Sequence, residues 1–323
     1  MKSSNPKSGG TGASHPVDAN RSLRDFIGLS VKGFCMGIAD VIPGISGGTI
    51  AFMLGIYEDL LKAIKSFDSA FLKMLLAGRI REAFGMVAWR FLGAVVFGIG
   101  CAILAFSGVV SWLLAHHPVL INAFFFGLIL MTVPIVGREV KRWEIGCVLL
   151  LIASSAGTYF FVQMVPVSTP DSWWFIFLCG ALAICAMILP GISGAFILLI
   201  LGKYQFIMNA VHERDLAVIA IFCSGIAVGI LSFVRILGWM FRRFYDRTLA
   251  VLTGFVVGSL AKIWPWKQVL ESVAVSENKI IPIREANMLP AAFDGQVLIA
   301  AGLFVTGCFA AFLLHAIPQK HLK

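Results

Sequence analysis

The sequence predicts an all-α polytopic membrane protein built from two inverted-topology repeats, each with a re-entrant Pro-Gly helical hairpin and about three transmembrane helices. Three observations predict this fold class: the composition, the recurrence of long apolar segments, and a Pro-Gly motif that occurs twice. The 323-residue chain is 59% hydrophobic and 13% charged, with a mean hydropathy of +0.90. Soluble domains are about 45–50% apolar and about 25% charged, so the composition indicates a membrane protein.

Apolar segments of about 17–25 residues, the length of a membrane-spanning helix, follow one another along the chain. No segment alternates apolar and polar residues with a period of two, which excludes a barrel of amphipathic strands. The predicted helical segments are 26–42, 44–61, 90–114, 119–136, 144–165, 173–189, 191–210, 216–240, 248–264 and 295–317.

A motif in the first part of the chain, residues 39–57, recurs at residues 186–204 with an offset of 147 and ten of nineteen positions identical. Proline ends a helix because it lacks an N–H group, and glycine permits the chain to reverse. The predicted helix breaks are Pro43, Gly44, Pro190 and Gly191. Paired breaks inside apolar sequence are typical of secondary transporters, whose substrate site lies at the breaks.

The repeat divides the chain into three parts. Residues 1–25 are polar and lack the apolar core of a secretory signal, so we expect a disordered cytoplasmic tail. Residues 26–165 form the first membrane repeat, with its hairpin at 26–61. Residues 166–323 form the second, with its hairpin at 173–210.

The distribution of lysine and arginine predicts the sidedness. Eighteen of the 26 basic residues fall in the tail, the 62–90 stretch, the 137–143 and 241–247 loops and the C-terminus, against six in the alternate gaps. The positive-inside rule then places both termini in the cytoplasm. One hairpin and three crossings separate the two motifs, so the second hairpin starts from the opposite face and the repeats are inverted.

Charge counting does not distinguish hairpins that dip half-way from hairpins that cross fully twice. Half-way re-entry is favoured because each arm is short. The stretch 67–88 resembles an amphipathic helix on the cytoplasmic face, and 265–294 is expected to be an outer loop. The net charge of +9 is explained by the cytoplasmic loops, so no nucleic-acid partner is predicted. The cysteine spacing predicts no disulfide and no metal site. No cofactor is predicted.

The second half of each break predicts an anion socket. A half-helix that starts at Ser46 or Ser193 leaves unpaired N–H groups and a partial positive charge in a region of low dielectric constant. Glycines there let a phosphate approach the backbone, which suits phosphate or carboxylate better than a cation. The alternative is that the glycines only let the hairpins pack. The predicted phosphate-binding residues are Ser46, Gly47, Gly48, Thr49, Ser193 and Gly194.

Charged residues within the apolar segments are further candidates. A carboxylate at membrane depth is costly, so Asp40 is a functional candidate by default. It either carries a proton in coupled transport or pairs with Lys32. Arg90 and Arg235 either snorkel to the interface or contact an anionic headgroup at the inner mouth.

The motifs resemble the bacterial DUF368 family. The resemblance rests on residues 37–49 followed by 55–58, on 190–194 before 201–204, and on 260–266, and it extends from about residue 26 to the C-terminus. PopT-type members are implicated in returning undecaprenyl phosphate across the cytoplasmic membrane. The resemblance therefore implies a multi-pass lipid transporter (flippase) of the bacterial cytoplasmic membrane, with polyprenyl phosphate as its partner, serving cell-wall biogenesis.

Two other functions stay open from the residues alone. The socket equally permits a small-anion secondary transporter. A membrane lipid phosphatase needs a nucleophile with an acid–base pair, and none of the histidines stands in a Ser-xxx-His or Arg-rich phosphatase pattern, so no enzyme is predicted. The coupling ion and the oligomeric state are left open.

Overall fold

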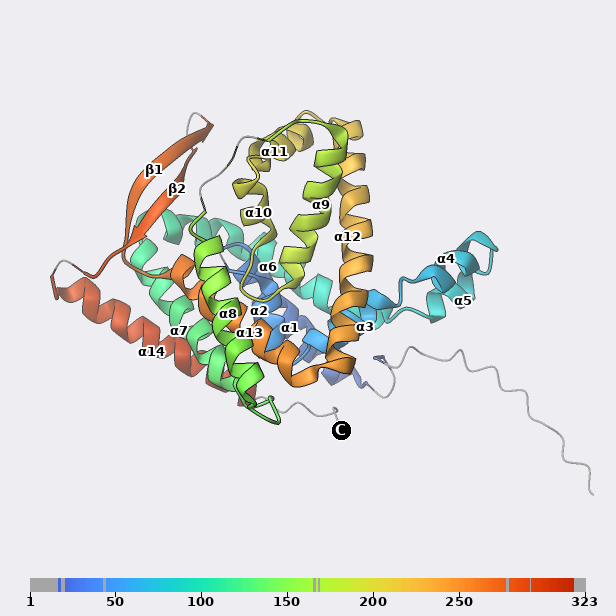
Figure 1. Cartoon of the computed structure of the whole chain (residues 1–323), viewed down its shortest axis with the longest axis horizontal. Helices are drawn as coiled ribbons and strands as arrows, with labels where there is room; N and C mark the ends of the chain where they lie inside the picture. The colour runs from blue at the N-terminus through green and yellow to red at the C-terminus, as the bar shows by residue number, and fades with distance from the viewer. Residues whose placement is uncertain are drawn as a thin grey trace, which may run out of the picture.

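The computed structural model describes residues 17–18, 21–42, 45–164, 167, 169–276, 279–290 and 292–316 (Figure 1). Within them the chain is mostly helical. The helices are α1 Leu23–Asp40, α2 Gly47–Met53, α3 Tyr57–Lys65, α4 Ser69–Leu76, α5 Ile80–Gly85, α6 Trp89–His116, α7 Pro118–Gly137, α8 Ile145–Phe161, α9 Trp173–Ile188, α10 Gly194–Ile200, α11 Tyr204–His212, α12 Leu216–Arg243, α13 Tyr245–Ser259, the 3-10 helix η1 Leu260–Ile263 and α14 Gly295–Ala316. Two strands, β1 Lys267–Ser276 and β2 Lys279–Asn287, form an antiparallel hairpin.

The two halves of the chain repeat the same helix lengths. Helices α2 and α10 both have seven residues, α3 and α11 both have nine, and α6 and α12 both have 28. Their packing also repeats, because α1 packs against α6 as α9 packs against α12. Two further pairs join the halves: α7 packs against α14, and α8 packs against α13.

Four helices in the described residues are long and apolar enough to cross a membrane, namely α6, α7, α12 and α14. They coincide with the predicted segments 90–114, 119–136, 216–240 and 295–317 and confirm a polytopic membrane protein. Helices α8 and α9 are shorter apolar helices of 17 and 16 residues. At about 1.5 Å per residue, α9 is about 24 Å long, less than the roughly 30 Å of a bilayer core.

The returning arm of each hairpin is broken, which the sequence did not predict. Instead of one helix over 44–61, α2 and α3 are separated at Gly55, which has a φ of 67°. Instead of one over 191–210, α10 and α11 meet at 109°, with Gly202 at a φ of 63°. Glycine adopts this left-handed conformation without the steric cost that a Cβ imposes, so each arm turns there.

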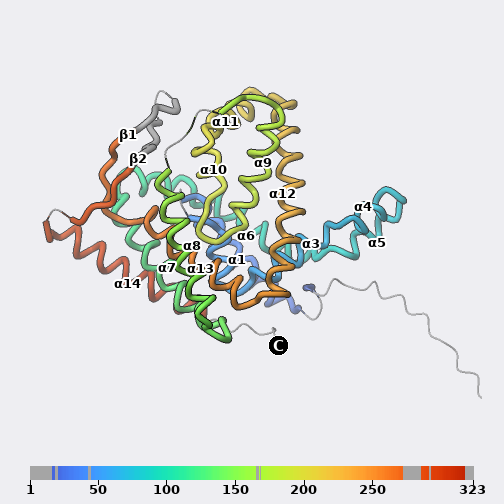
Figure 2. Tube along the Cα trace, viewed as in Figure 1, coloured from blue at the N-terminus to red at the C-terminus, as the bar shows by residue number. Residues whose placement is uncertain are grey.

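The turn between α9 and α10 lies inside the molecule. Figure 2 shows the chain descending along α9, reversing, and returning along α10 to α11, while α12 continues beyond the reversal. In Figure 1 the β-hairpin and α11 lie at the top of the view, and the α7–α8 loop and the α12–α13 turn lie at the bottom. All seven residues of α2 are buried, so this short helix lies at the centre of the core.

The amphipathic stretch 67–88 forms two helices, α4 and α5, and not one. Gly78 between them has a φ of 73°, which ends the first helix. Leu72, Leu76 and Ile80 are exposed on this pair, as an interfacial helix requires.

The loop expected at 265–294 contains the β-hairpin, so the all-α prediction is corrected to a mostly helical fold. Its register pairs Lys267 with Asn287 and Ser276 with Lys279. The strands are rich in valine and isoleucine, which favour extended backbone. The strands also contain acidic and basic residues, which are typical of a solvated loop, so the sequence did not predict them.

The end of the predicted tail 1–25 is structured. Helix α1 begins at Leu23, and Arg21 pairs with Asp59 at 2.6 Å. The Asp18 carboxylate accepts the backbone N–H of Phe91 at 2.9 Å, at the start of α6. Residues 1–16 lie outside the described residues.

Glycines set the closest helix crossings at equivalent places in the halves. A Cβ added at Gly98 of α6 would lie 2.9 Å from the carbonyl carbon of Ser30 on α1. A Cβ added at Gly225 of α12 would lie 2.9 Å from the carbonyl carbon of Phe177 on α9. Small residues let helix backbones approach in this way, which was expected for Gly225 from its small-xxx-small spacing.

We expect Gly225→Ala to destabilise the protein by about 1–3 kcal/mol, because the added methyl group meets a backbone carbonyl that cannot move aside. Gly238→Ala, in the same helix, is the matched control. Its Cβ would meet only the end of the Arg242 side chain at 3.8 Å, so helix propensity should stabilise it by up to about 1 kcal/mol. Thermal unfolding in detergent measures both. Equal melting temperatures would contradict close packing at Gly225.

Candidate functional site

The two helix breaks contact each other directly. The Thr49 hydroxyl oxygen accepts a hydrogen bond from the N–H of Gly191 at 2.8 Å. The Ser46 hydroxyl donates to the carbonyl oxygen of Met187 at 3.1 Å. Both hydroxyl-bearing residues are buried, with 0% of the surface of Thr49 and 1% of that of Ser46 exposed. The start of α2 therefore packs against the α9–α10 turn through hydrogen bonds.

The predicted N-cap is present in the first break and incomplete in the second. Ser46 has an extended backbone and its hydroxyl accepts the N–H of Gly48 at 3.1 Å, which caps α2. Ser193 holds the same position before α10, yet its side chain makes no capping hydrogen bond. The reversal before it requires glycine, because Gly191 has a φ of 89°. Pro43 and Gly44 lie outside the described residues.

Asp40 supplies an anion to the start of α2. Its carboxylate, at the end of α1, accepts the N–H of Gly47 at 2.6 Å. A Cβ added at Gly47 would lie 2.9 Å from the Asp40 carboxyl carbon, so glycine is needed for this contact. The partial positive charge at the helix start is thus already matched by a negative group of the protein.

The start of α10 has no such group. The position equivalent to Asp40 is Met187 (40 + 147 = 187). Among the described residues, none accepts from the N–H of Gly194 or Ala195, or from the Ser193 hydroxyl. Ser193 is half-buried and Ala195 is exposed, whereas α2 is buried throughout. In the described part of the chain, the start of α10 is therefore the more accessible of the two, although Gly194 is buried, and its donors are unused.

Lys32 does not lie against Asp40, which answers one of the alternatives posed by the sequence. Its ammonium group donates to the carbonyl oxygen of Leu54 at 3.0 Å, at the bend between α2 and α3. Its electrostatic partners are Arg21 and Asp59, at the same end of the hairpin. The ion-pair explanation of Asp40 is therefore wrong for this conformation.

A buried lysine, which was not predicted as a functional residue, lies at the equivalent place in the second hairpin. We call this place, the bend between α2 and α3 or between α10 and α11, the corner of each hairpin. Lys203 is 3% exposed, donates to the carbonyl oxygen of Thr169 at 2.7 Å, and pairs with Asp171. Its charge acts on Cys179, which is the counterpart of Lys32 (32 + 147 = 179). Each half thus brings one lysine to this corner, from α1 in one and from the α10–α11 bend in the other.

Among the described residues, the two arginines proposed for the headgroup make no hydrogen bond or ion pair with the breaks. Arg90 is exposed in the first turn of α6, where its backbone N–H bonds to Asp18 at 3.3 Å. Arg235 is exposed on α12, and its guanidinium donates to the Leu231 carbonyl oxygen of its own helix at 2.9 Å. A role for either in contacting a headgroup stays a prediction.

The fold defines a polytopic helical membrane protein. Its two helix breaks meet in the core, where polar groups of one break bond to the backbone of the other. The chain belongs to the undecaprenyl phosphate translocase-like (VCA0040-like) family, whose sequence model matches residues 36–281. The matched residues include both breaks and most of the β-hairpin.

Two relatives of known name extend this similarity over most of the chain. A polyprenyl-phosphate transporter of Vibrio cholerae is 40% identical over 270 residues, which cover 84% of this chain and 88% of the relative. A polyprenyl-phosphate transporter of Staphylococcus aureus is 29% identical over 255 residues, which cover 73% and 85%. No solved structure matches the chain.

We expect Thr49→Val to destabilise the protein by about 1–3 kcal/mol, because it leaves the buried N–H of Gly191 without an acceptor. Thr49→Ser keeps the hydroxyl and should restore most of the loss. Thr306→Val is the matched control, since that threonine is exposed on α14 and bonds only within its own helix. The measurement is thermal unfolding in detergent. A Thr49→Val protein as stable as the Thr306→Val control would show that the contact between the breaks is unimportant.

Proposed function

We propose that this protein transports a polyprenyl phosphate, such as undecaprenyl phosphate, across the bacterial cytoplasmic membrane from the outer to the inner leaflet. The observation that carries the proposal is the hydrogen-bonded contact between the two breaks, Thr49 to Gly191 and Ser46 to Met187. The names of the two relatives support the lipid substrate. The phosphate is held at the breaks while the prenyl chain stays in lipid.

Of the two half-helix starts, the start of α10 receives the phosphate group before the start of α2 does. Within the described part of the chain, the N–H groups of Gly194 and Ala195 and the Ser193 hydroxyl have no hydrogen-bond acceptor, and the helix start favours an anion. Ser46, Gly48 and Thr49 are engaged with the protein in this conformation. They reach the phosphate only when the two breaks separate, which is the movement that alternating access requires.

Asp40 couples the movement to protons. As a carboxylate it occupies the N–H of Gly47, where a phosphate would have to sit. Protonation removes the negative charge and weakens the hydrogen bond that Asp40 accepts. The α2 start is then free to receive the phosphate from α10, so the proton on Asp40 and the headgroup at α2 are bound at the same time.

The two halves, residues 26–165 and 166–323, form inverted-topology repeats with re-entrant hairpins at 26–61 and 173–210. The equal helix lengths and the repeated packing of α1 on α6 and α9 on α12 support this proposal. In an inverted arrangement both termini, with the tail 1–25, lie in the cytoplasm. The basic α7–α8 and α12–α13 connections then face the same side, as Figure 1 places them.

Labelling with a membrane-impermeant maleimide in intact cells tests the topology. We expect Pro170→Cys, before α9, to be labelled from outside, and Lys141→Cys, in the α7–α8 loop, to be labelled only after the cells are opened. Both residues are exposed, and the exposed native Cys223 is first replaced by serine. Labelling of both positions in intact cells would exclude this arrangement.

Reconstitution tests the transport proposal. The full chain is placed in liposomes that contain a fluorescent polyprenyl phosphate, and loss of lipid from the outer leaflet is followed by chemical quenching. We expect Ser46→Ala to slow translocation about fivefold, since a helix cap contributes about 1 kcal/mol. Gly47→Leu should block it, because the side chain meets Asp40. Asp40→Asn should slow it and remove its dependence on an imposed pH gradient.

Ser224→Ala is the matched control, an exposed serine of α12 that bonds within its own helix. Normal translocation by all three site variants would show that the proposed site is wrong. Translocation of free phosphate without lipid movement by the unmodified protein would instead identify a small-anion transporter.

A further inference from the structure

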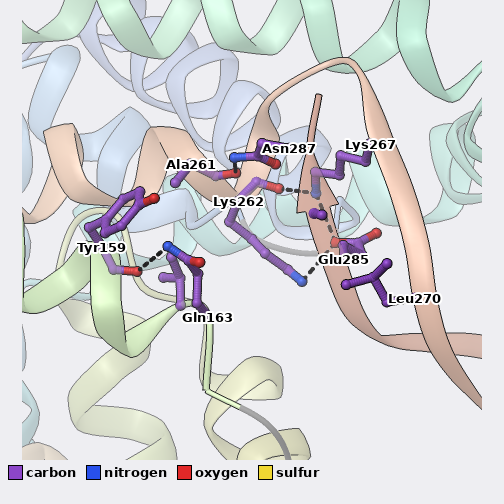
Figure 3. Close-up of a pocket in the computed structure, with 10 residues that line it drawn as sticks. Tyr159, Gln163, Ala261, Lys262, Lys267, Leu270, Glu285 and Asn287 are labelled. Carbon is purple, nitrogen blue, oxygen red and sulfur yellow. Dashed lines mark hydrogen bonds and ion pairs between the residues drawn. The ribbon is translucent and has the colours of Figure 1, made fainter. Parts of the chain in front are cut away.

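A polar cavity lies between the β-hairpin and the end of α8. Its volume is 340 Å³, and its polar lining residues are Tyr159, Gln163, Lys262, Lys267, Glu285 and Asn287. Figure 3 shows Tyr159 of α8 and Gln163, which follows α8, on one side, Lys267 and Glu285 of the hairpin on the other, and Lys262 between them.

Two lysines converge on one carboxylate oxygen at this cavity. Lys262 and Lys267 lie 3.0 Å and 2.9 Å from the same oxygen, Oε2, of Glu285. Two ammonium groups against one carboxylate leave one net positive charge. All three side chains are less than one-fifth exposed, so solvent screens this charge less than at an open surface.

The network leaves donors unused. Lys267 also donates to the carbonyl oxygen of Lys262 at 2.5 Å, so it is held by two acceptors. Among the described residues, Lys262 donates only to Glu285, and an ammonium group has three donors. Lys262 is therefore the group that can bind an added anion without losing its present partner.

The charge states fit an anion site outside the membrane-spanning helices. Burial lowers the pKa of Lys267, and the Glu285 carboxylate opposes that effect. Burial alone would raise the pKa of Glu285, yet Lys267 and Lys262 together hold it below its ordinary value. Glu285 is therefore ionised at neutral pH and competes with any anion for the two lysines.

One lysine of the cavity also contacts the first turn of α10. The Lys262 ammonium lies over the ring of Phe196, 5.1 Å from its centroid. Phe196 is two residues after Gly194, which is about 3 Å along a helix. Phe196 also packs with Val162, another residue that lines the cavity. An anion held by Lys262 thus lies beside the half-helix whose donors are unused.

We propose that the Lys262–Lys267–Glu285 cavity is a reception site for a phosphate group, from which the phosphate passes to the start of α10. The passage of phosphate from the cavity to α10 rests on the proposed function, whereas phosphate binding at the cavity does not depend on it. The apolar side chains of Val162 and Leu270 in the same lining suit the first units of a prenyl chain. The phosphate belongs either to a lipid headgroup or to free phosphate, and the two sources are separable.

The experiment measures binding of farnesyl phosphate and of inorganic phosphate to the purified full chain by calorimetry. Lys262→Gln should weaken binding about tenfold, because it removes a charge-assisted hydrogen bond. Glu285→Gln should tighten binding about threefold or more, because it removes the competing carboxylate. Lys73→Gln, an exposed lysine of α4, is the matched control and should bind as the unmodified protein does.

Opposite effects of the two substitutions are the decisive result, since a purely structural network would be harmed by both. Unchanged binding by Lys262→Gln overturns the proposal, and so does weaker binding by a Glu285→Gln protein that keeps its melting temperature. Tighter binding of farnesyl phosphate than of inorganic phosphate assigns the site to a lipid headgroup, and equal binding assigns it to free phosphate.

Translocation assays separate this inference from the proposed function. Lys262→Gln should raise the lipid concentration needed for half-maximal translocation and leave the maximal rate unchanged, whereas Ser46→Ala lowers the maximal rate. If the unmodified protein moves no polyprenyl phosphate, the proposed function fails while calorimetric binding at the cavity still supports the site. If Lys262→Gln lowers only the maximal rate, the cavity is not where the phosphate is received.

Discussion

Backbone polar groups inside a membrane protein must find partners within the protein, and this constraint governs the centre of the structure. Breaking two helices in the buried core leaves N–H and C=O groups without partners in their own helix and away from water. The structure satisfies many of them by placing one break on the other. Thr49 accepts from Gly191, Ser46 donates to Met187, and Asp40 accepts from Gly47. Each hydrogen bond ties together segments that only this arrangement brings into contact.

The two halves have a similar backbone arrangement but differ in the positions of their charged residues. The first half has Asp40 at its break and Lys32 at its corner, whereas the second has Met187 and Cys179 at those positions and takes its corner lysine from Lys203. The lysine can come from different elements because a side chain from the first helix of the hairpin and one from the bend itself both extend to the corner. The charge at the break is not replaced, so the halves have different electrostatic surroundings at their half-helix starts. That difference makes the two half-helix starts chemically distinct in an otherwise repeated fold.

The position of most helices followed from the sequence, because long apolar segments have few stable forms in a bilayer. Helices α6, α7, α12 and α14 lie where the segments 90–114, 119–136, 216–240 and 295–317 placed them. The errors fall where local signals are weak or conflict. The bends at Gly55 and Gly202 were missed because a glycine inside an apolar run is as often a packing position as a turn. The β-hairpin was missed because its charged residues hid its strand propensity.

The sequence by itself determined the class of protein, the two breaks and the candidate donors at them, because composition, proline and glycine act locally. It also determined the family, through motifs that stay contiguous in the chain. Only the tertiary structure decided which donors are engaged, that Asp40 bonds to Gly47 and not to Lys32, and that Lys262, Lys267 and Glu285 meet at one cavity. Those contacts join residues of different elements, and their distances depend on how the helices and the hairpin pack, which no local pattern encodes.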